Sequence, residues 1–239
     1  CAAMLAARPV AISSVMGLYP PEFVAEMKAQ GIAWMATVTT VAEALAAEAA
    51  GADVIVAQGA EAGGHRGAFE AAEAERRAVG LFALVPAVAD AVRLPIVAAG
   101  SIADGRTAAA ALLLGASAVQ LGTALLRTPE AAIHPAWSAA LEGLRPEDTM
   151  LSRAFSGRAG RGVATTYARA AVASDAPAPA PYPVQRGLTA PMRRAAAEAN
   201  DVQRMQAWAG QAARLARAEP AGEVVTRVWE ETRGLLSAA

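Results

Sequence analysis

The stretch from residue 57 to residue 67 gathers the side chains that acid–base chemistry uses. It has the sequence A-Q-G-A-E-A-G-G-H-R-G and directly follows an apolar, β-branched run, 53–58, which predicts a buried strand. Glycines allow positive φ angles and let the backbone lie close to a ligand. We therefore predict a functional site here, rather than a plain surface turn, formed by Gln58, Glu61, His65 and Arg66.

The roles of these side chains follow from their chemistry. His65 can act as a base or as a hydrogen-bond donor at a reacting atom. Arg66 can attract an anionic substrate, although an exposed arginine beside a loop is equally ordinary. Glu61 can orient His65 or Arg66, or can simply face water. The sequence leaves these alternatives for Arg66 and Glu61 open.

Two further loops have the composition of a phosphate site. Gly100 and Ser101 end the run P-I-V-A-A-G-S, and Gly122 and Thr123 follow the run A-V-Q-L. Backbone N–H groups of such loops can point at an anion. Because the two loops follow consecutive predicted strands, the sequence predicts that they hold one phosphate together.

Strands and helices are predicted to alternate through the first half of the chain. The expected strands are 10–15, 32–38, 53–58, 94–99 and 118–121, and the expected helices are 21–30, 41–50, 81–92 and 105–114. Continuous apolar strands indicate a parallel sheet buried on both faces, in an α/β fold. A TIM (β/α)₈ barrel and a doubly wound open sheet both place active sites at strand carboxyl ends. Five units cannot close an eight-stranded barrel, so either three units are missing upstream or the sheet is open.

The pattern changes after residue 128. We expect helices over 130–144, 189–218 and 224–236, a basic glycine-rich loop over 150–162, and an extended proline-rich segment over 176–183. These helices carry no catalytic constellation, and we expect them to pack on the barrel or on a neighbouring subunit. The predicted division is therefore a barrel portion, 1–162, and a C-terminal proline-rich segment with helices, 163–239.

Composition excludes several classes of protein. The 239 residues carry a formal net charge of −1, which gives no basic field for nucleic acid or for an anionic membrane. The single cysteine, Cys1, rules out an internal disulfide and fits a reducing, cytoplasmic compartment. Two histidines and one cysteine leave no metal-ligand spacing, so no metal is expected. Neither a Walker A loop nor a G-x-S-x-G motif is present in the sequence.

Residues 108–126 carry no charge and are nominally long enough to cross a membrane. Glycine, serine, glutamine and threonine interrupt the second half of this run. It divides better into a helix, 107–114, a turn at Gly115 and a strand, 118–121. We therefore favour a buried helix and strand over a membrane span.

The assembled motifs resemble the nitronate monooxygenase family, formerly called 2-nitropropane dioxygenases. The similar stretches are A-Q-G-A-E-A-G-G-H-R-G, V-A-A-G-S-I-A-D-G-R, V-Q-L-G-T-A, F-S-G-R-A-G-R-G and P-Y-P-V-Q-R-G-L-T-A-P. The first is quite specific, whereas the second and third are shared with other FMN-dependent barrels. Together they cover nearly the whole chain.

This resemblance implies a TIM barrel that holds FMN without a covalent link. His65 matches the active-site histidine near the flavin, acting as base for a neutral nitroalkane and mainly positioning a nitronate, which is already anionic. The implied reaction uses molecular oxygen and gives a carbonyl compound and nitrite; no nucleic acid or membrane partner is implied, and self-association is compatible. The positions implied to contact or approach FMN are Gln58, Gly63, Gly64, Gly100, Ser101, Gln120, Leu121, Gly122 and Thr123.

The chain departs from the family pattern in three places. Relatives begin with further strands that include a flavin-contacting P-M segment, so we expect an N-terminally truncated barrel in which the strands present are the fourth to the eighth. Ser101 stands where a second glycine is usual, and its backbone N–H group can still donate a hydrogen bond. The stretch 13–17 has the sequence S-S-V-M-G where relatives often have S-F-H-F-G, which is expected to change substrate preference.

Two other functions fit the same motifs. One is reduction of an enoyl thioester or a quinone by NAD(P)H in a sister FMN-dependent barrel. The other is a truncated, catalytically silent domain that serves only as a packing partner. Rapid reduction of the flavin by NADH but not by a nitronate would favour the first, and a colourless protein that ignores added FMN would favour the second.

Overall fold

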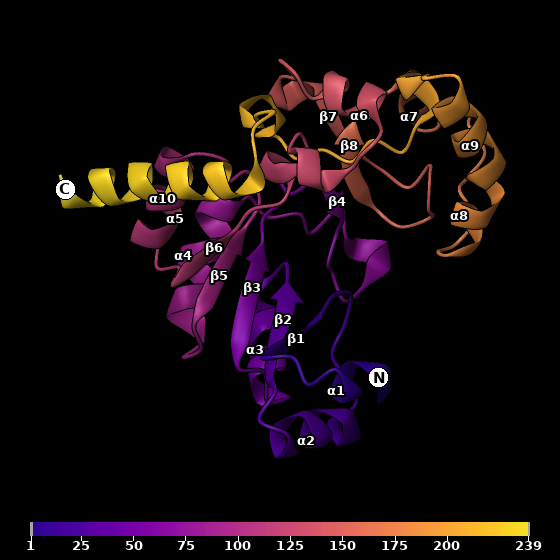
Figure 1. Cartoon of the computed structure of the whole chain (residues 1–239). Coiled ribbons are helices and arrows are strands. Elements are labelled where there is room, and N and C mark those ends of the chain that lie inside the picture. Colours follow the sequence, from indigo (N-terminus) through magenta and orange to yellow (C-terminus); the bar gives the residue numbers. More distant parts are fainter. Residues whose placement is uncertain (1, 239) are drawn as a thin grey trace. The chain divides into compact units, whose positions relative to one another are not determined.

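The computed structural model describes residues 2–238 (Figure 1), so the inference drawn from Cys1 lies outside the described residues. Contacts divide the chain into two compact units that interleave along the sequence. The first, here called the sheet unit, holds the residues up to Ala60 together with Gly67–Ala99 and Ala110–Gln120. The second, the C-terminal unit, holds Glu61–Arg66, Gly100–Ala109 and Leu121 onward. The division expected after Gly162 stays a prediction.

The sheet unit is built on five parallel strands, which confirms the α/β fold class and each expected strand. The strand order is β1-β2-β3-β5-β6, so every strand lies beside the next one of this sheet in the sequence. A doubly wound sheet reverses its order at a switch point, whereas a (β/α)₈ barrel adds strands in one direction. The order is therefore that of a barrel. The strands are β1 (Ala11–Ser14), β2 (Ala33–Val38), β3 (Val54–Gln58), β5 (Ile96–Ala99) and β6 (Ala118–Gln120).

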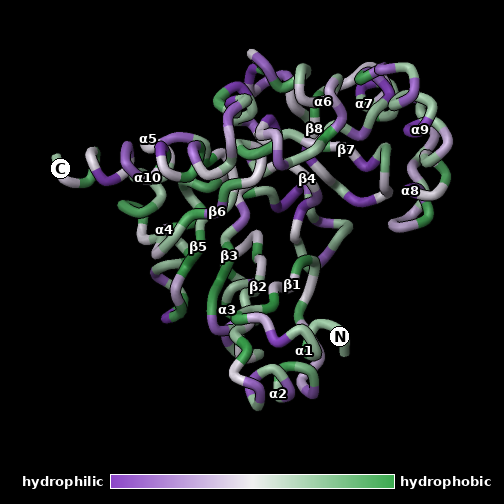
Figure 2. The backbone as a smooth tube through the Cα atoms, viewed as in Figure 1, coloured by the Kyte–Doolittle hydropathy of each residue, from purple (hydrophilic) through white to green (hydrophobic). Residues whose placement is uncertain are grey.

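Helices connect these strands and begin and end near the residues that the sequence predicts. The helix α2 (Pro21–Ala29) starts on a proline, and Gly31, at φ +70°, follows its end. The helices α3 (Val41–Ala49) and α4 (Leu81–Ala91) contact the strands that flank them, while α5 (Gly105–Leu113) follows β5. A short helix at the start of the chain, α1 (Ala2–Ala6), was not predicted. The strands are mostly apolar (Figure 2).

The uncharged run 108–126 divides as expected. It contributes the end of α5, a turn at Gly115 with φ +107°, and the strand β6. Within residues 2–238, the structure contains no helix that combines the length and the apolar character needed to span a membrane.

The start of α3 ties three segments of the sheet unit together through one carboxylate. Thr40 caps the helix by accepting a hydrogen bond from the Glu43 N–H group at 3.2 Å. The Glu43 carboxylate accepts hydrogen bonds from the N–H and hydroxyl groups of Thr39 at 2.6 and 2.8 Å. It also accepts the N–H group of Phe69 at 2.8 Å. One side chain therefore joins the end of β2, the start of α3 and the loop 67–80.

We expect Glu43→Ala to lower the free energy of unfolding by about 2–4 kcal/mol, because hydrogen bonds to a charged acceptor are each worth about 1.5–3 kcal/mol and are not fully additive. Urea unfolding measures this loss, and hydrogen exchange at the Phe69 amide should quicken in the folded protein. Glu26→Ala, on the exposed surface of α2, is the matched control and should change stability by less than about 0.5 kcal/mol. Equal stability of the two variants would show that the Glu43 contacts add nothing.

The C-terminal unit contains a three-stranded antiparallel sheet in the order β4-β8-β7. The expectation of a loop over 150–162 is wrong, because β7 (Thr149–Ser152) and β8 (Gly160–Val163) pair there. The strand β4 (Gly64–His65) adds to the other side of β8. The glycines of this segment indicated a loop, but other segments pack closely against them: a Cβ on Gly160 would lie 2.8 Å from the Trp208 ring, and one on Gly162 would lie 2.7 Å from the Ala207 carbonyl oxygen.

The predicted extent of two long helices in this unit is also wrong. The predicted helix 130–144 is interrupted by Ala132, which has φ +49°, and only α6 (Pro135–Ala140) remains. The predicted helix 189–218 ends early because Asn200 adopts φ +52°, after which the chain runs past Trp208 in a bridge to Gly162. The last helix is confirmed as α10 (Ala221–Ser237), yellow in Figure 1.

The remaining helical elements are short. The α-helices are α7 (Thr166–Ala170), α8 (Val184–Leu188) and α9 (Ala190–Glu198). The 3₁₀ turns are η1 (Ala71–Glu73), η2 (Thr123–Leu125), η3 (Pro129–Ala131), η4 (Pro146–Asp148), η5 (Val202–Arg204) and η6 (Ala213–Leu215).

Candidate functional site

His65 lies on a strand and not on a free loop. In the register of β4 and β8, Gly64 lies opposite Arg161 and His65 opposite Gly160. The N–H group of Arg66 continues this pairing by donating to the Ala159 carbonyl at 2.9 Å. The three-stranded sheet therefore fixes the backbone on both sides of the histidine.

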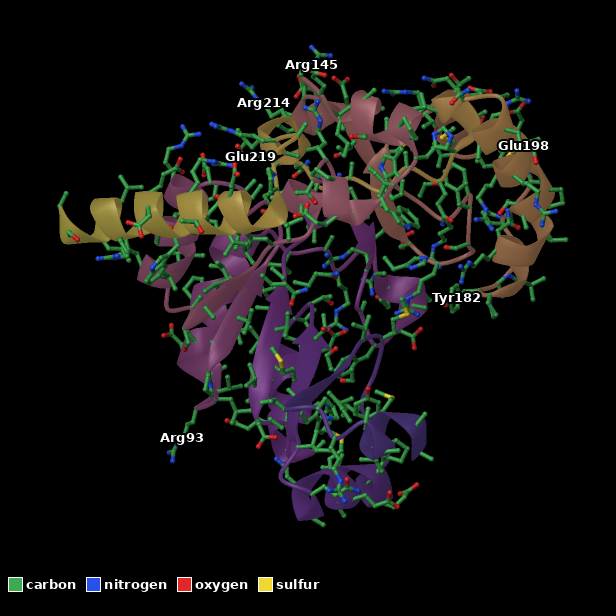
Figure 3. All side chains as sticks on the ribbon, viewed as in Figure 1. Arg93, Arg145, Tyr182, Glu198, Arg214 and Glu219 are labelled. Atoms are coloured by element: carbon green, nitrogen blue, oxygen red, sulfur yellow. The ribbon has the colours of Figure 1, made fainter. Side chains whose placement is uncertain are left out.

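Three side chains from distant parts of the C-terminal unit surround the His65 ring. The Nε2 atom lies 2.8 Å from the hydroxyl oxygen of Ser156. The ring meets Trp208 and Tyr182 edge-on, with centroid separations of 5.0 and 5.7 Å. Tyr182, labelled in Figure 3, lies in the segment just before α8. Trp208 lies in the stretch 189–218, for which the sequence predicts only a packing helix. The sequence gave Ser156 and Tyr182 no role, although both lie in stretches that carry the family resemblance.

The surroundings keep the His65 imidazole neutral. Burial lowers the pKa of His65 below its usual value of 6.5, and the positive charges of Arg158 and Arg186 lower this pKa further. A histidine with a lowered pKa is uncharged at neutral pH and can accept a proton.

The two charged neighbours of His65 in the sequence have structural contacts. The Arg66 side chain is buried, with 1% of its surface exposed, so it is not the exposed loop arginine that the sequence allowed. The Arg66 carbonyl accepts a hydrogen bond from Nε of Arg158 at 3.2 Å. Glu61 interacts electrostatically with Arg161, and its carbonyl accepts the N–H group of Gln211 at 3.0 Å.

Gly63 packs closely against the backbone of another segment of this unit. A Cβ on Gly63 would lie 2.5 Å from the nitrogen of Gly210 and 2.8 Å from Oγ1 of Thr123. Thr123 Oγ1 accepts the N–H group of Gly210 at 3.0 Å. Two predicted site residues, Gly63 and Thr123, therefore meet at one point. The side of Gly64 is open, since a Cβ there would meet nothing within 4 Å.

The loop 100–101 lies beside the same segment. Gly100 has φ +126°, and a Cβ on it would lie 3.3 Å from the Cβ of Ala62. Ser101 has φ +49°, and its hydroxyl oxygen is buried without a hydrogen-bond partner among the described residues. Leu121 and Gly122 lead into η2, and a Cβ on Gly122 would meet no atom within 4 Å. The buried, unsatisfied hydroxyl of Ser101 and the open glycine backbone at Gly122 each suit an anionic group such as a phosphate.

Gln58 and Gln120 lie in the sheet unit, at the carboxyl ends of β3 and β6. In the sheet register both lie opposite Ala99, one on each side of β5. Oε1 of Gln58 accepts the N–H group of Gly67 at 2.8 Å. This hydrogen bond joins the two residues that flank the segment 59–66. The sequence did not reveal this structural role of Gln58.

A comparison with protein families matches residues 2–231 to the nitronate monooxygenase family. A curated nitronate monooxygenase of Pseudomonas aeruginosa is 43% identical over 97% of this chain and 66% of its own length. The chain therefore spans about two thirds of the length of this relative.

Solved structures give the same result. The chain is similar to a nitroalkane oxidase from Streptomyces ansochromogenes, with a TM-score of 0.92 and 41% identity over 99% of this chain and 68% of that one. It also resembles FabK from Thermotoga maritima, with a TM-score of 0.75 and 29% identity over 95% of this chain and 68% of that one. The strand order, the family match and these relatives together show that the chain belongs to the nitronate monooxygenase family.

Proposed function

We propose that this chain carries the active-site histidine of an FMN-dependent enzyme that oxidises alkyl nitronates or nitroalkanes with molecular oxygen to carbonyl compounds and nitrite. The observation that carries the proposal concerns His65, which belongs to the G-G-H segment typical of the family. His65 is half-buried and neutral, and it is hydrogen-bonded to Ser156. The names of the relatives support the substrate class. FMN, when bound, would supply the electron acceptor that passes electrons on to oxygen.

Several residues of the C-terminal unit are suited to hold the flavin. The Ser101 hydroxyl and the backbone N–H groups of 122–123 would bind the phosphate, and the open side of Gly64 would admit the ring system. Gln58 and Gln120 of the sheet unit are proposed as further contacts from their motif positions. The remaining proposed contacts are Gly63, Gly100 and Leu121.

His65 would have a different role for each form of the substrate. A neutral nitroalkane must lose a proton from carbon, and a neutral imidazole can accept it. A nitronate has already lost that proton, so His65 would only orient it. The positive charges of Arg158 and Arg186, which lower the pKa of His65, also favour an anion beside the ring.

Rapid mixing in the absence of oxygen tests the proposal. We expect a nitronate to bleach the flavin absorbance quickly and NADH to do so slowly, with nitrite released when oxygen is admitted. Rapid bleaching by NADH alone would overturn the proposal in favour of an NAD(P)H-dependent reductase. A protein that stays colourless with added FMN would favour a catalytically silent domain.

Two further points belong to the proposal. A cytoplasmic location is proposed because a single cysteine suits a reducing compartment. Self-association through the C-terminal helices is also proposed, since α10 exposes Val225 and Trp229.

Ser101→Ala is expected to weaken FMN binding by about tenfold to a hundredfold, because a hydrogen bond to a charged acceptor is worth about 1.5–3 kcal/mol. The stability of the FMN-free protein should stay the same or rise slightly, since the hydroxyl is buried without a partner among residues 2–238. Fluorescence titration with FMN measures the affinity, and thermal unfolding measures the stability. An unchanged affinity for FMN would exclude the Ser101 hydroxyl from the phosphate site.

A further inference from the structure

Ser156 is a buried serine whose hydroxyl group joins two structural elements of the C-terminal unit. It lies in the connection between β7 and β8, and 1% of its surface is exposed. Its oxygen lies 2.8 Å from Nε2 of His65, 3.2 Å from the carbonyl oxygen of Arg158 and 3.4 Å from the backbone nitrogen of Arg158. The hydroxyl therefore links the histidine of β4 to the turn that leads into β8.

The hydrogen bonds of this hydroxyl constrain the proton on His65. A serine hydroxyl has one proton to donate and can accept two. The Arg158 carbonyl can only accept, so its contact is a hydrogen bond only if Ser156 donates to it. In that arrangement the Ser156 oxygen must accept from Nε2–H of His65 and from the Arg158 N–H group. All three contacts are then satisfied at once.

The opposite arrangement satisfies fewer groups. If Ser156 donated its single proton to Nε2, it could not donate a hydrogen bond to the Arg158 carbonyl. A buried carbonyl facing a hydroxyl lone pair is unfavourable. The geometry thus favours neutral His65 with its proton on Nε2.

We infer that Ser156 is a positioning residue that holds the His65 ring and fixes its proton on Nε2. The lone pair of the neutral ring is then on Nδ1. The edges of Trp208 and Tyr182 limit rotation of the same ring. This inference rests on the proposed role of His65, and it adds which residue holds the ring and sets its tautomer.

Charged and titratable groups around the ring come from several segments. Arg158 precedes β8, Arg186 lies in α8, and the Tyr182 phenol lies before α8. Arg66 follows His65 in the chain, and Arg161 lies opposite Gly64 on β8. Four of these five groups are arginines, so the charged side chains among them are all basic.

Nitrogen NMR of protein labelled at histidine tests the inference directly. The sequence contains two histidines, so two imidazole signals are expected. His134 is an internal reference, because its Nδ1 accepts the N–H group of Ala136 at 3.2 Å and its neutral form must carry the proton on Nε2. At alkaline pH, we expect the His65 signals to show the same tautomer.

We expect Ser156→Ala to give a mixture of the two His65 tautomers and to slow turnover of a neutral nitroalkane about tenfold to a hundredfold, with a much smaller effect on a nitronate. Displacing a catalytic group by about 1 Å can slow a reaction by a factor of this size. Ser152→Ala is the matched control: Ser152 is a buried serine of β7 whose oxygen accepts the Ala154 N–H group at 3.0 Å. This control should leave the His65 signals and the turnover unchanged.

The inference is overturned if the unaltered protein carries the His65 proton on Nδ1, or if Ser156→Ala leaves the tautomer unchanged. These outcomes are read from the spectrum and do not need bound FMN. Failure of the proposed function would appear instead as absence of bleaching by a nitronate, with the tautomer still as expected.

Discussion

His65→Asn should reduce turnover of neutral nitroalkanes by about a hundredfold to ten-thousandfold, because general base catalysis contributes an effect of this size. Asparagine keeps a polar side chain beside Ser156 but cannot accept a proton near neutral pH. Oxidation of a nitronate should fall much less, since no proton has to be removed from it. Steady-state assays with matched nitroalkane and nitronate substrates measure the two effects, and the flavin spectrum shows whether FMN stays bound.

The dependence of the rate on pH provides a second readout of the same substitution. The pKa of His65 is lowered by burial and by Arg158 and Arg186, so the base becomes protonated only at a pH below its usual value of 6.5. Turnover of the nitroalkane by the unaltered protein should rise as pH rises through that lowered pKa, below 6.5, and then level off. His65→Asn should remove this rise.

His134→Asn is the matched control. His134 caps α6 by accepting the Ala136 N–H group, and asparagine caps helices well, so this variant should keep its fold and its activity. If His65→Asn turned over nitroalkanes as fast as this control, His65 would not be the base.

Gly63→Ala is expected to destabilise the C-terminal unit by about 1–3 kcal/mol or more, the usual cost of forcing an atom into a packed space. The new Cβ would lie 2.5 Å from the Gly210 nitrogen and 2.8 Å from the carbonyl carbon of Ala209. Both are backbone atoms, so neither can swing aside as a flexible side chain does. The segment next to His65 would have to shift, and bound FMN should be lost with it. Thermal unfolding and flavin retention measure both effects.

Substitutions at two other glycines distinguish the effect of crowding on stability from the effect of backbone strain. At Gly64 a Cβ meets nothing within 4 Å but φ is +81°, so Gly64→Ala should cost only the roughly 1–2 kcal/mol of a left-handed residue. At Gly222, in α10, a Cβ also meets nothing within 4 Å, so Gly222→Ala should stabilise the helix slightly. A Gly63→Ala protein as stable as the Gly222→Ala protein would contradict the close packing of Gly63 against Gly210.

The elements of the sheet unit could be predicted because local signals and burial agree there. The run V-I-V-A-Q is apolar and β-branched, and it forms β3. Thr40 and Glu43 mark the start of α3, and Gly51 marks the turn after it. Strand order was the part left open, because a barrel and a doubly wound sheet share the same alternation of strands and helices.

The C-terminal unit was harder to predict because its strands depend on distant partners. The run G-R-G-V has no strand-like composition, yet it pairs with β4 on one side and β7 on the other. The same dependence explains the shortened helices, since alanine-rich segments favour a helix until a left-handed residue such as Asn200 turns the chain. Local propensity could not show that the chain turns there.

The sequence alone determined the family and the residue types of the loops, and it singled out His65 as the candidate histidine, because these are fixed by motifs of adjacent residues. Only the tertiary structure decided what surrounds His65, because Ser156, Tyr182 and Trp208 lie about 90 to 145 positions further along the chain. Folding brings them to one ring through the pairing of β4 with β8. That pairing also turns a glycine-rich loop into a strand, on which the proton of the histidine can be held at one nitrogen.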